Sequence, residues 1–366
     1  MKRCIQLYAR RRQSSFYVSM PQSPGSVWQP SGNGKRLFGS SRPLHHSSSH
    51  SDDSAGVQVT RSSPSSSPTY QQENVDAKLL VDGLLERTRS LMDGSDYHII
   101  AYSGGVDSAL VAALVHNSAT SEESIRAVLG LSPAVPSDQV ALAEHVAHVI
   151  GVTLEQIPTT EGTDATYIEN SGQACLACKT HLYSCLDAIV EHAGNRRLYN
   201  GTNADDLQDP TRLGLIAADN FEVQSPLRYT TKDNVRAAAK YLGLPNWNYA
   251  ASPCLRSRLA LGVVAIPEHL QRIEQAERQV RQSLGLNSTH NLRVRLLAQN
   301  RAMVEVEAQH LEAANSLLDT WQTLFQEELG FASVGVRSFK SGSEAKVVEP
   351  KKDYALPKRD QVEVYA

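Results

Sequence analysis

The segment at 103–108, which reads SGGVDS, has the residue types of a loop that binds phosphate groups. Two consecutive glycines let the backbone turn sharply and bring its N–H groups close to an anion. Ser103 and Ser108 add hydroxyl donors, and a helix that starts here directs the positive end of its dipole toward the same point. The chain has no GKS or GKT triplet, so this is not the loop of kinase-type nucleotide hydrolases. We therefore expect Ser103, Gly104, Gly105 and Ser108 to bind pyrophosphate.

Acidic residues accompany this loop and a second polar segment. Asp107 would repel a phosphate group, so we expect it to act through Mg²⁺. The second segment, GTNADD, begins at Gly201, which permits a close approach of the backbone. Its Asn203, Asp205 and Asp206 are suited to orienting a nucleotide or Mg²⁺. For both segments the alternative is a purely structural turn.

The chain has five cysteines, too few and too unevenly spaced for a disulfide framework, which indicates a reducing compartment. Cys175 and Cys178 form a C-x-x-C pair that we expect to lie before a helix. Such a pair can be a redox couple, half of a zinc site or half of a cluster site. No second such pair exists, and the twelve histidines show no spacing typical of a metal site, so Cys254 is the distant thiol available to the pair. We expect Cys185 to lie in the core, and we assign no role to Cys4.

Alternating strands and helices are expected to position these segments. Apolar residues at helical spacing predict a helix over 76–93, and an apolar run predicts a strand over 97–103 that ends in the glycine loop. Further elements are predicted at 108–117 (helix), 125–132 (strand), 137–151 (helix), 152–157 (strand) and from 198 (strand). Strands that alternate with helices indicate a parallel sheet covered on both faces. We therefore predict a doubly wound α/β fold with its ligand at the carboxyl ends of the strands.

The C-terminal third has a different pattern. The stretch 231–245 predicts a helix capped by Thr231. Alternating apolar residues over 292–308 predict a strand hairpin, and a helix is expected over about 310–329. We accordingly divide the chain into four parts: an N-terminal extension (1–75), an α/β domain (76–258), a smaller α+β domain (259–343) and a charged tail (344–366).

Charge differs along the chain. Residues 1–50 contain eight Lys or Arg and no acid, and since the whole chain carries −3, the remainder carries −11. This acidic body argues against a nucleic-acid partner, and no apolar run reaches the roughly 18 residues of a membrane-spanning helix, so no membrane partner is expected. The Arg-rich and Ser-rich start resembles an organellar transit peptide, with a plain disordered extension as the alternative. We expect a cytoplasmic protein, or a mitochondrial or plastid one if residues 1–50 act as a transit peptide.

SGGVDS resembles the PP-loop of the N-type ATP pyrophosphatases. The resemblance implies an adenine nucleotide alpha hydrolase-like fold. Enzymes of this group split ATP into AMP and pyrophosphate while they adenylate a carboxylate or carbonyl oxygen. Three further segments are CLACKTHLYSCL, the stretch 201–227 and ASPCLRSRLALG. Together, over about 76–343, they resemble the LarE-type sulfur transferases, which insert sulfur into a pyridinium dicarboxylate mononucleotide during synthesis of the nickel-pincer nucleotide cofactor. Two positions depart from that pattern: Arg256 stands where alanine is commoner, and TRLGL replaces a commoner Arg-Pro-Gly-Leu while keeping Arg212.

The resemblance implies ATP and Mg²⁺ as cofactors and a small-molecule substrate, and we also expect a homo-oligomer. A thiolate attacks the adenylated carboxylate, and Cys254 is the candidate sulfur-bearing residue because Arg256 and Arg258 favour its thiolate. Arg212 and Arg258 are the candidates to bind the acidic substrate.

The source of the sulfur has two interpretations. The resemblance implies that Cys175, Cys178 and Cys254 hold a [4Fe–4S] cluster whose open iron carries an extra sulfide, which is the version we favour. Family members that keep only the third cysteine are thought to sacrifice its sulfur and leave dehydroalanine. Two other classes stay open: a tRNA-thiolating PP-loop enzyme, which the acidic body disfavours, and an ammonia-using amide synthetase, which needs no C-x-x-C pair.

Overall fold

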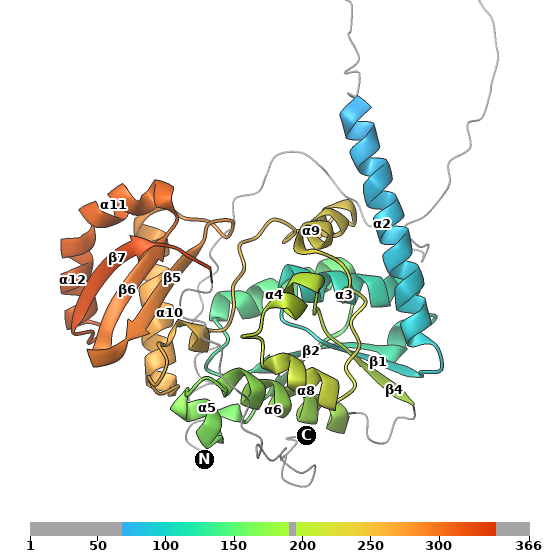
Figure 1. The fold of residues 1–366 in the computed structure, drawn as a ribbon, viewed down its shortest axis with the longest axis horizontal. Coiled ribbons are helices and arrows are strands. Elements are labelled where there is room, and N and C mark those ends of the chain that lie inside the picture. Colours follow the sequence, from blue (N-terminus) through green and yellow to red (C-terminus); the bar gives the residue numbers. More distant parts are fainter. Residues whose placement is uncertain (1–67, 190–194, 342–366) are drawn as a thin grey trace, which may run out of the picture. The chain divides into compact units, whose positions relative to one another are not determined.

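The computed structural model describes residues 68–189 and 195–341 of the chain (Figure 1). The proposed transit peptide at 1–50 and the tail at 344–366 lie outside these residues. Among the helices of the described part, none is both long enough and apolar enough to cross a membrane.

A four-stranded sheet, in the order β3-β2-β1-β4, forms the centre of the larger part of the fold. All its pairings are parallel, with Ile100 of β1 opposite Ala127 of β2 and Tyr199 of β4. Its strands are β1 (Tyr97–Ala101), β2 (Ile125–Leu131), β3 (Leu154–Pro158) and β4 (Arg196–Tyr199). Because the strands are parallel, their four carboxyl ends lie at one edge, where an α/β fold binds its ligand.

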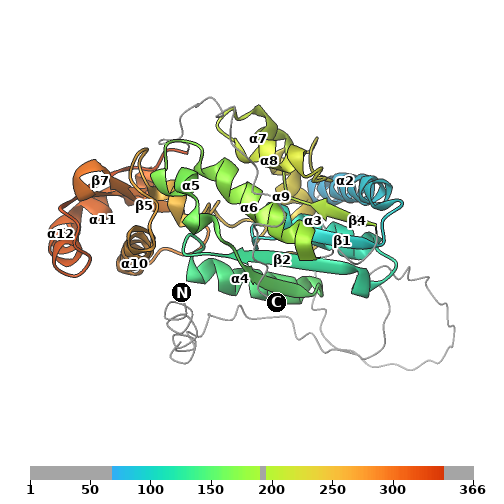
Figure 2. The ribbon, with the colours of Figure 1, turned by 90° about the horizontal axis from the view of Figure 1, so that it is seen from below.

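Helices cover both faces of this sheet (Figure 2). Neighbouring residues of a strand point to opposite faces. Thus Ile100 packs with Leu110 in one buried cluster, while Ile99 packs with Leu186 and Ala217 in another. The first face carries α2 (Pro68–Met92), α3 (Val106–Ser118), α4 (Ser137–Ile150) and α9 (Lys232–Tyr241), and the second carries α6 (Ala174–Ile189) and α8 (Gly214–Asn220). The predicted α/β fold with a parallel sheet is confirmed.

Helix α3 is buried along nearly its whole length. Its sequence from Ala109 to Val115 is entirely apolar, and every one of these residues is buried. A helix that is apolar all round is stable only when other elements surround it. The segment before α3 is therefore fixed by a rigid helix on one side and by strand β1 on the other.

A second, three-stranded sheet forms the centre of the smaller part. Strand β5 (Leu292–Leu297) pairs antiparallel with β6 (Arg301–Val306), which pairs parallel with β7 (Ser333–Ser338). Three helices accompany it, α10 (Pro267–Ser283), α11 (Leu311–Ser316) and α12 (Leu318–Glu327). The predicted hairpin and the smaller α+β part are confirmed, whereas the expected helix over 310–329 is two helices separated at Leu317.

Within the described residues, shorter elements lie between the strands and the longer helices. Two of them are α-helical, α5 (Ala165–Glu169) and α7 (Ala204–Gln208). Five are 3₁₀-helices: η2 (Glu122–Ser124), η3 (Glu161–Thr163), η4 (Leu255–Arg258), η5 (Ala298–Asn300) and η6 (Ala308–His310).

Candidate functional site

The glycine loop at 103–108 joins β1 to α3, as predicted. Gly104 has a φ of +70°, and a Cβ at this position would lie 2.6 Å from the Cα of Ala143, so no other residue fits without displacing α4. Within the loop, the Ser103 N–H donates to Ser108 Oγ over 3.1 Å, and Ser108 Oγ lies 3.1 Å from the carbonyl oxygen of Gly105. The two predicted serines therefore hold the loop in its shape.

Two side chains that the sequence analysis did not select support this loop from outside. Gln139 Nε2 donates to the carbonyl oxygen of Ser103 over 2.5 Å, and Asn246 Nδ2 donates to that of Gly104 over 2.8 Å. Asn246 is 1% exposed, and its Oδ1 has no hydrogen-bond partner among the described residues. In the sequence, Asn246 stands out only as a polar residue directly after Gly243 and Pro245, which predict the end of a helix.

Asp107 joins three separate segments of the chain. Its Oδ1 accepts a hydrogen bond from Asn203 Nδ2 over 3.0 Å, and its Oδ2 accepts one from the ammonium of Lys232. Lys232 is a candidate site residue that the sequence analysis did not select. It is the first residue of α9, where the helix dipole disfavours a cation, and that conflict is the signal that could have identified it.

The GTNADD segment packs directly against the first turn of α3. A Cβ at Gly201 would lie 2.8 Å from the backbone nitrogen of Ser108, so glycine permits this crossing of two backbones. Asn203 is buried and forms a capping box with Asp206 at the start of α7. Burial raises the pKa of Asp206, and the charge of Arg212 partly opposes that shift.

Asp205 and Arg212 lie at the exposed side of this segment. The guanidinium of Arg212 is paired with Asp206 at 2.7 Å and with Asp209 at 3.5 Å, while its side chain stays 57% exposed. It can therefore still reach a ligand, and its role in substrate binding stays a prediction.

The C-x-x-C pair lies inside a helix rather than before one. Cys175 and Cys178 belong to the first turns of α6, which begins at Ala174. Ala174 and Ala177 of the same turns pack into the buried cluster of the smaller sheet. The guanidinium of Arg256 donates to the sulfur of Cys175. The motif at 251–262 is thereby brought to the C-x-x-C pair.

The third cysteine is anchored at the carboxyl edge of the large sheet. Cys254 is the N-terminal flanking residue of η4, and the next residue, Leu255, donates its N–H to the carbonyl oxygen of Ala134 over 2.8 Å. Ala134 lies in the loop that leaves β2, the strand beside β1. The cysteine loop is therefore held against the loop that leaves β2, and the glycine loop leaves the neighbouring strand β1 at the same edge.

The thiols lie beside apolar side chains and close to other ionisable groups. Burial raises the pKa of Cys178, and Glu161 and Cys254 raise it further. Burial also raises the pKa of Tyr167, with Cys254 as the next cause. Glu161, which the sequence analysis did not select, is 2% exposed, and its Oε2 has no hydrogen-bond partner among the described residues. Cys185 is buried in the core, as expected.

Arg258 supports the cysteine loop. It is 1% exposed, its Nε donates to Glu277 Oε1 over 2.9 Å, and its Nη1 donates to the carbonyl oxygen of Cys254 over 3.1 Å. In this structure it positions the Cys254 backbone, and a direct contact with substrate stays a prediction.

Comparisons with known proteins agree with these motifs. The chain is 34% identical over 235 residues, 64% of its length, to an uncharacterized protein of Synechocystis sp., of which the match covers 85%. It is 30% identical over 193 residues, 51% of its length, to the pyridinium-3,5-bisthiocarboxylic acid mononucleotide synthase of Lactiplantibacillus plantarum, of which the match covers 67%. No family model matches the chain.

Proposed function

Because the chain belongs to the LarE-type sulfur transferase family, we propose that it is an ATP-dependent enzyme that adenylates a pyridinium dicarboxylate mononucleotide and replaces a carboxylate oxygen with sulfur. The product would serve the synthesis of a nickel-pincer nucleotide cofactor. At the level of the family, the chain is an enzyme of sulfur transfer that acts on a small molecule.

One observation carries this proposal: the hydrogen bond from Leu255 N–H to the Ala134 carbonyl oxygen. It ties the Cys254 loop to the carboxyl end of β2, and the glycine loop follows the carboxyl end of the adjacent β1. A nucleotide loop and a thiol at one edge are what an adenylation followed by a sulfur attack requires.

The first half-reaction is assigned to the glycine loop and its neighbours. A carboxylate oxygen of the substrate attacks the α-phosphorus of ATP, and pyrophosphate leaves. Ser103, Gly104, Gly105 and Ser108 would bind the departing phosphates. Asp107 is the proposed ligand of Mg²⁺, which when bound neutralises phosphate charge.

The second half-reaction is assigned to Cys254. Its thiolate attacks the adenylated carbonyl carbon, a C–S bond forms, the C–O bond to AMP breaks, and AMP leaves with the electron pair. Loss of the α-proton of Cys254 and cleavage of its Cβ–S bond then release the thiocarboxylate and leave dehydroalanine. The Arg256 guanidinium donates to the sulfur of Cys175 and also interacts electrostatically with Cys254 and Cys178.

The cluster version uses the same three cysteines. Cys175, Cys178 and Cys254 would hold a [4Fe–4S] cluster, which when bound supplies a sulfide in place of the cysteine sulfur. Cys178 and Cys254 both border the apolar cluster of the smaller sheet, and thiols against an apolar wall are a fitting donor set.

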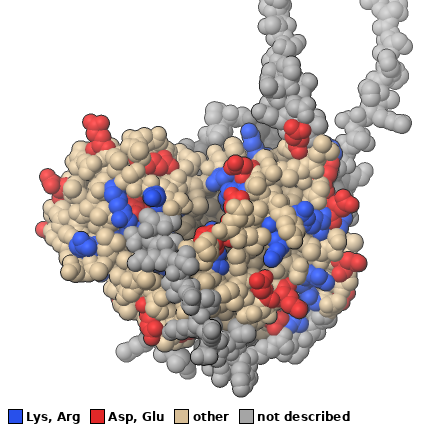
Figure 3. All heavy atoms as spheres, viewed as in Figure 1, with Lys and Arg blue, Asp and Glu red and all other residues tan. Residues whose placement is uncertain are grey.

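Charge distribution supports a small substrate. Lys and Arg side chains are interspersed with Asp and Glu on the face in Figure 3, rather than gathered into one broad basic area of the kind that binds RNA.

The test is a variant that separates the two half-reactions. Cys254→Ala should release pyrophosphate from ATP and the dicarboxylate mononucleotide but form no thiocarboxylate, whereas Cys185→Ala, in the core of α6, should do both. Intact-mass and iron analysis of anaerobic protein before and after turnover would tell a lost cysteine sulfur from a cluster-borne sulfide. Thiolation by Cys254→Ala would contradict the assignment, and AMP formation that requires ammonia would indicate an amide synthetase.

A further inference from the structure

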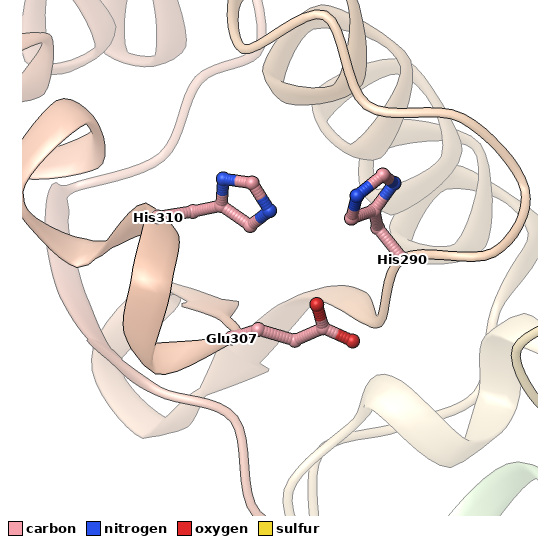
Figure 4. Close-up of side chains that lie close together, drawn as sticks. All are labelled: His290, Glu307 and His310. Carbon is pink, nitrogen blue, oxygen red and sulfur yellow. The ribbon is translucent and has the colours of Figure 1, made fainter.

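His290, Glu307 and His310 converge in the smaller part of the fold and belong to none of the motifs described above (Figure 4). Within residues 68–189 and 195–341, they are the one set of three His, Cys, Asp or Glu side chains whose ligand atoms all lie within 4.8 Å of one another. All three are partly buried.

The β5–β6 hairpin brings these residues together. Leu292 of β5 pairs with Val306 of β6, so the residues just before β5 lie opposite those just after β6. Glu307 and His310 then flank and end the 3₁₀ turn η6, which puts them three residues apart on one turn. The convergence depends on strand pairing, which explains why the histidine spacing along the sequence did not reveal it.

Glu307 presents one carboxylate oxygen to the centre of this group. The N–H and the Nδ2 of Asn291 both donate to its Oε1, over 3.0 and 2.8 Å. Both hydrogen bonds from Asn291 are thus made to Oε1, and Oε2 is the oxygen that the exposed Gln309 side chain contacts.

His290 is held in one tautomer by its neighbours. Its Nδ1 lies 2.8 Å from Asn287 Oδ1, an oxygen that also accepts from the N–H and hydroxyl of Thr289. Because that oxygen can only accept, Nδ1 donates to it, and Nε2 is the acceptor atom of the ring in its neutral form. This arrangement is typical of a metal-ligating histidine, whose other nitrogen donates to an oxygen.

His310 and Glu307 share a single donor. The exposed Gln309 side chain places its Nε2 3.2 Å from Glu307 Oε2 and 3.2 Å from His310 Nε2. An amide N–H group is therefore directed at two acceptor atoms that face a common point. A divalent cation satisfies both acceptors more strongly than one exposed amide can.

We propose that His290, Glu307 and His310 form a binding site for a divalent transition-metal ion, with Zn²⁺ as its probe. Two imidazole nitrogens and one carboxylate oxygen are a known zinc ligand set with an open fourth position. Ligands 2.0–2.1 Å from one zinc ion lie roughly 3.3 Å apart in a tetrahedron. The atoms here, within 4.8 Å, reach that spacing by rotation of side chains.

The bound ion would also hold the Cys254 loop. The turn that carries His290 accepts a hydrogen bond at its Ser288 carbonyl oxygen from the Ala250 N–H over 3.0 Å. Ala250 lies four residues before Cys254. An ion that pins this turn to β6 would therefore restrict the loop that carries the third cysteine.

The experiment is a Zn²⁺ titration of the full chain by calorimetry, repeated with Co²⁺ by visible absorption. Because thiols bind zinc too, it is done in the wild-type chain and in a Cys175→Ser, Cys178→Ser, Cys254→Ser background. His290→Ala, Glu307→Gln and His310→Ala should each weaken one site by at least about tenfold, and Asn287→Ala, acting through His290, by about tenfold.

The matched control is His145→Ala with His148→Ala, which removes two exposed imidazoles from one face of α4. This double variant should leave the affinity of the site unchanged. The histidines of the N-terminal extension are present in every variant, so they do not affect the comparison. Unchanged affinity in all three ligand variants, or an equal loss in the α4 control, would mean that the group is only a pair of imidazoles in edge-to-face contact beside a carboxylate. If the cysteine-free chain does not fold, the comparison within the wild-type chain decides.

Discussion

The ammonium of Lys232 donates a hydrogen bond to Asp107 Oδ2, although 125 residues separate the two in the sequence. The contact joins the first residue of α9 to the first turn of α3. It places a positive charge beside the loop that we propose binds the phosphates of ATP. Since both side chains are more than a quarter exposed, the pair adds little to stability, and its position indicates a role in binding.

Removing this cation should impair the first half-reaction. Lys232→Ala should lower kcat/KM for pyrophosphate release about 100-fold, because the phosphate charge loses a fixed cation. Lys240→Ala, at the other end of α9, is the matched control, since that ammonium lies over the ring of Trp247. A coupled pyrophosphate assay measures both. Equal activity of the two variants would remove Lys232 from the site.

Gly104 should be required for both fold and binding. Gly104→Ala combines a φ of +70° with a Cβ 2.6 Å from Ala143 Cα, and we expect it to lower the free energy of unfolding by about 2–5 kcal/mol. Gly94 has almost the same φ, +71°, but a new Cβ there would meet nothing within 4 Å. Gly94→Ala should therefore lower the free energy of unfolding by about 1–3 kcal/mol, through backbone strain alone. Urea unfolding compares the two. Equal losses would show that packing against α4 does not constrain the loop.

The sequence was most informative where a feature is local. An apolar strand, two glycines and an apolar helix follow one another directly, so the loop at 103–108 and its place in a parallel sheet could be predicted. The hairpin of β5 and β6 could also be predicted, because apolar and polar residues alternate within each strand and the two strands follow one another in the sequence. By contrast, β7 was not predicted, because its six residues SVGVRS contain only two large apolar side chains and pair with β6 by a parallel crossover.

Non-local contacts account for the site residues that were missed. Asn246 reaches Gly104 from 142 residues away, and Lys232 reaches Asp107 only because α9 packs beside α3. Likewise, the first turns of α6 pack into the buried cluster of the smaller sheet, and C-x-x-C, which was expected before the helix, lies in them. Residue types can suggest a role, but convergence of distant segments becomes visible only in the fold.

Stability should depend on pH through Cys178. Burial raises the pKa of its thiol above the ordinary value of 9.0, so the folded state favours the protonated form. The resulting stabilisation is complete below pH 9.0 and is lost as the pH rises toward the folded-state value. We therefore expect Cys178→Ala to lose less free energy of unfolding with rising alkaline pH than the wild type does. Urea unfolding of reduced protein with a chelator, using Cys175→Ala as control, tests this, and parallel curves would contradict it.

The last prediction concerns Arg256, which lies two residues after Cys254. Its guanidinium donates to the sulfur of Cys175 and, over 3.2 Å, to Asn170 Oδ1. A cation beside a sulfur favours the thiolate, which is the form that reacts with alkylating agents. Arg256→Ala should therefore slow iodoacetamide labelling of Cys175 about tenfold at neutral pH.

Peptide mass mapping of labelled protein gives the rate for each cysteine separately. Arg272→Ala is the control, because its guanidinium lies over the Phe331 ring, within the smaller part of the fold, and should leave Cys175 unaffected. A lower labelling rate could also arise from a shifted loop, so Arg256→Lys is measured beside it. Since lysine keeps the charge but loses the planar fork that spans Cys175 and Asn170, partial recovery of the rate assigns the effect to charge. Labelling that is faster in Arg256→Ala than in the wild type would show that the guanidinium shields the sulfur rather than activating it.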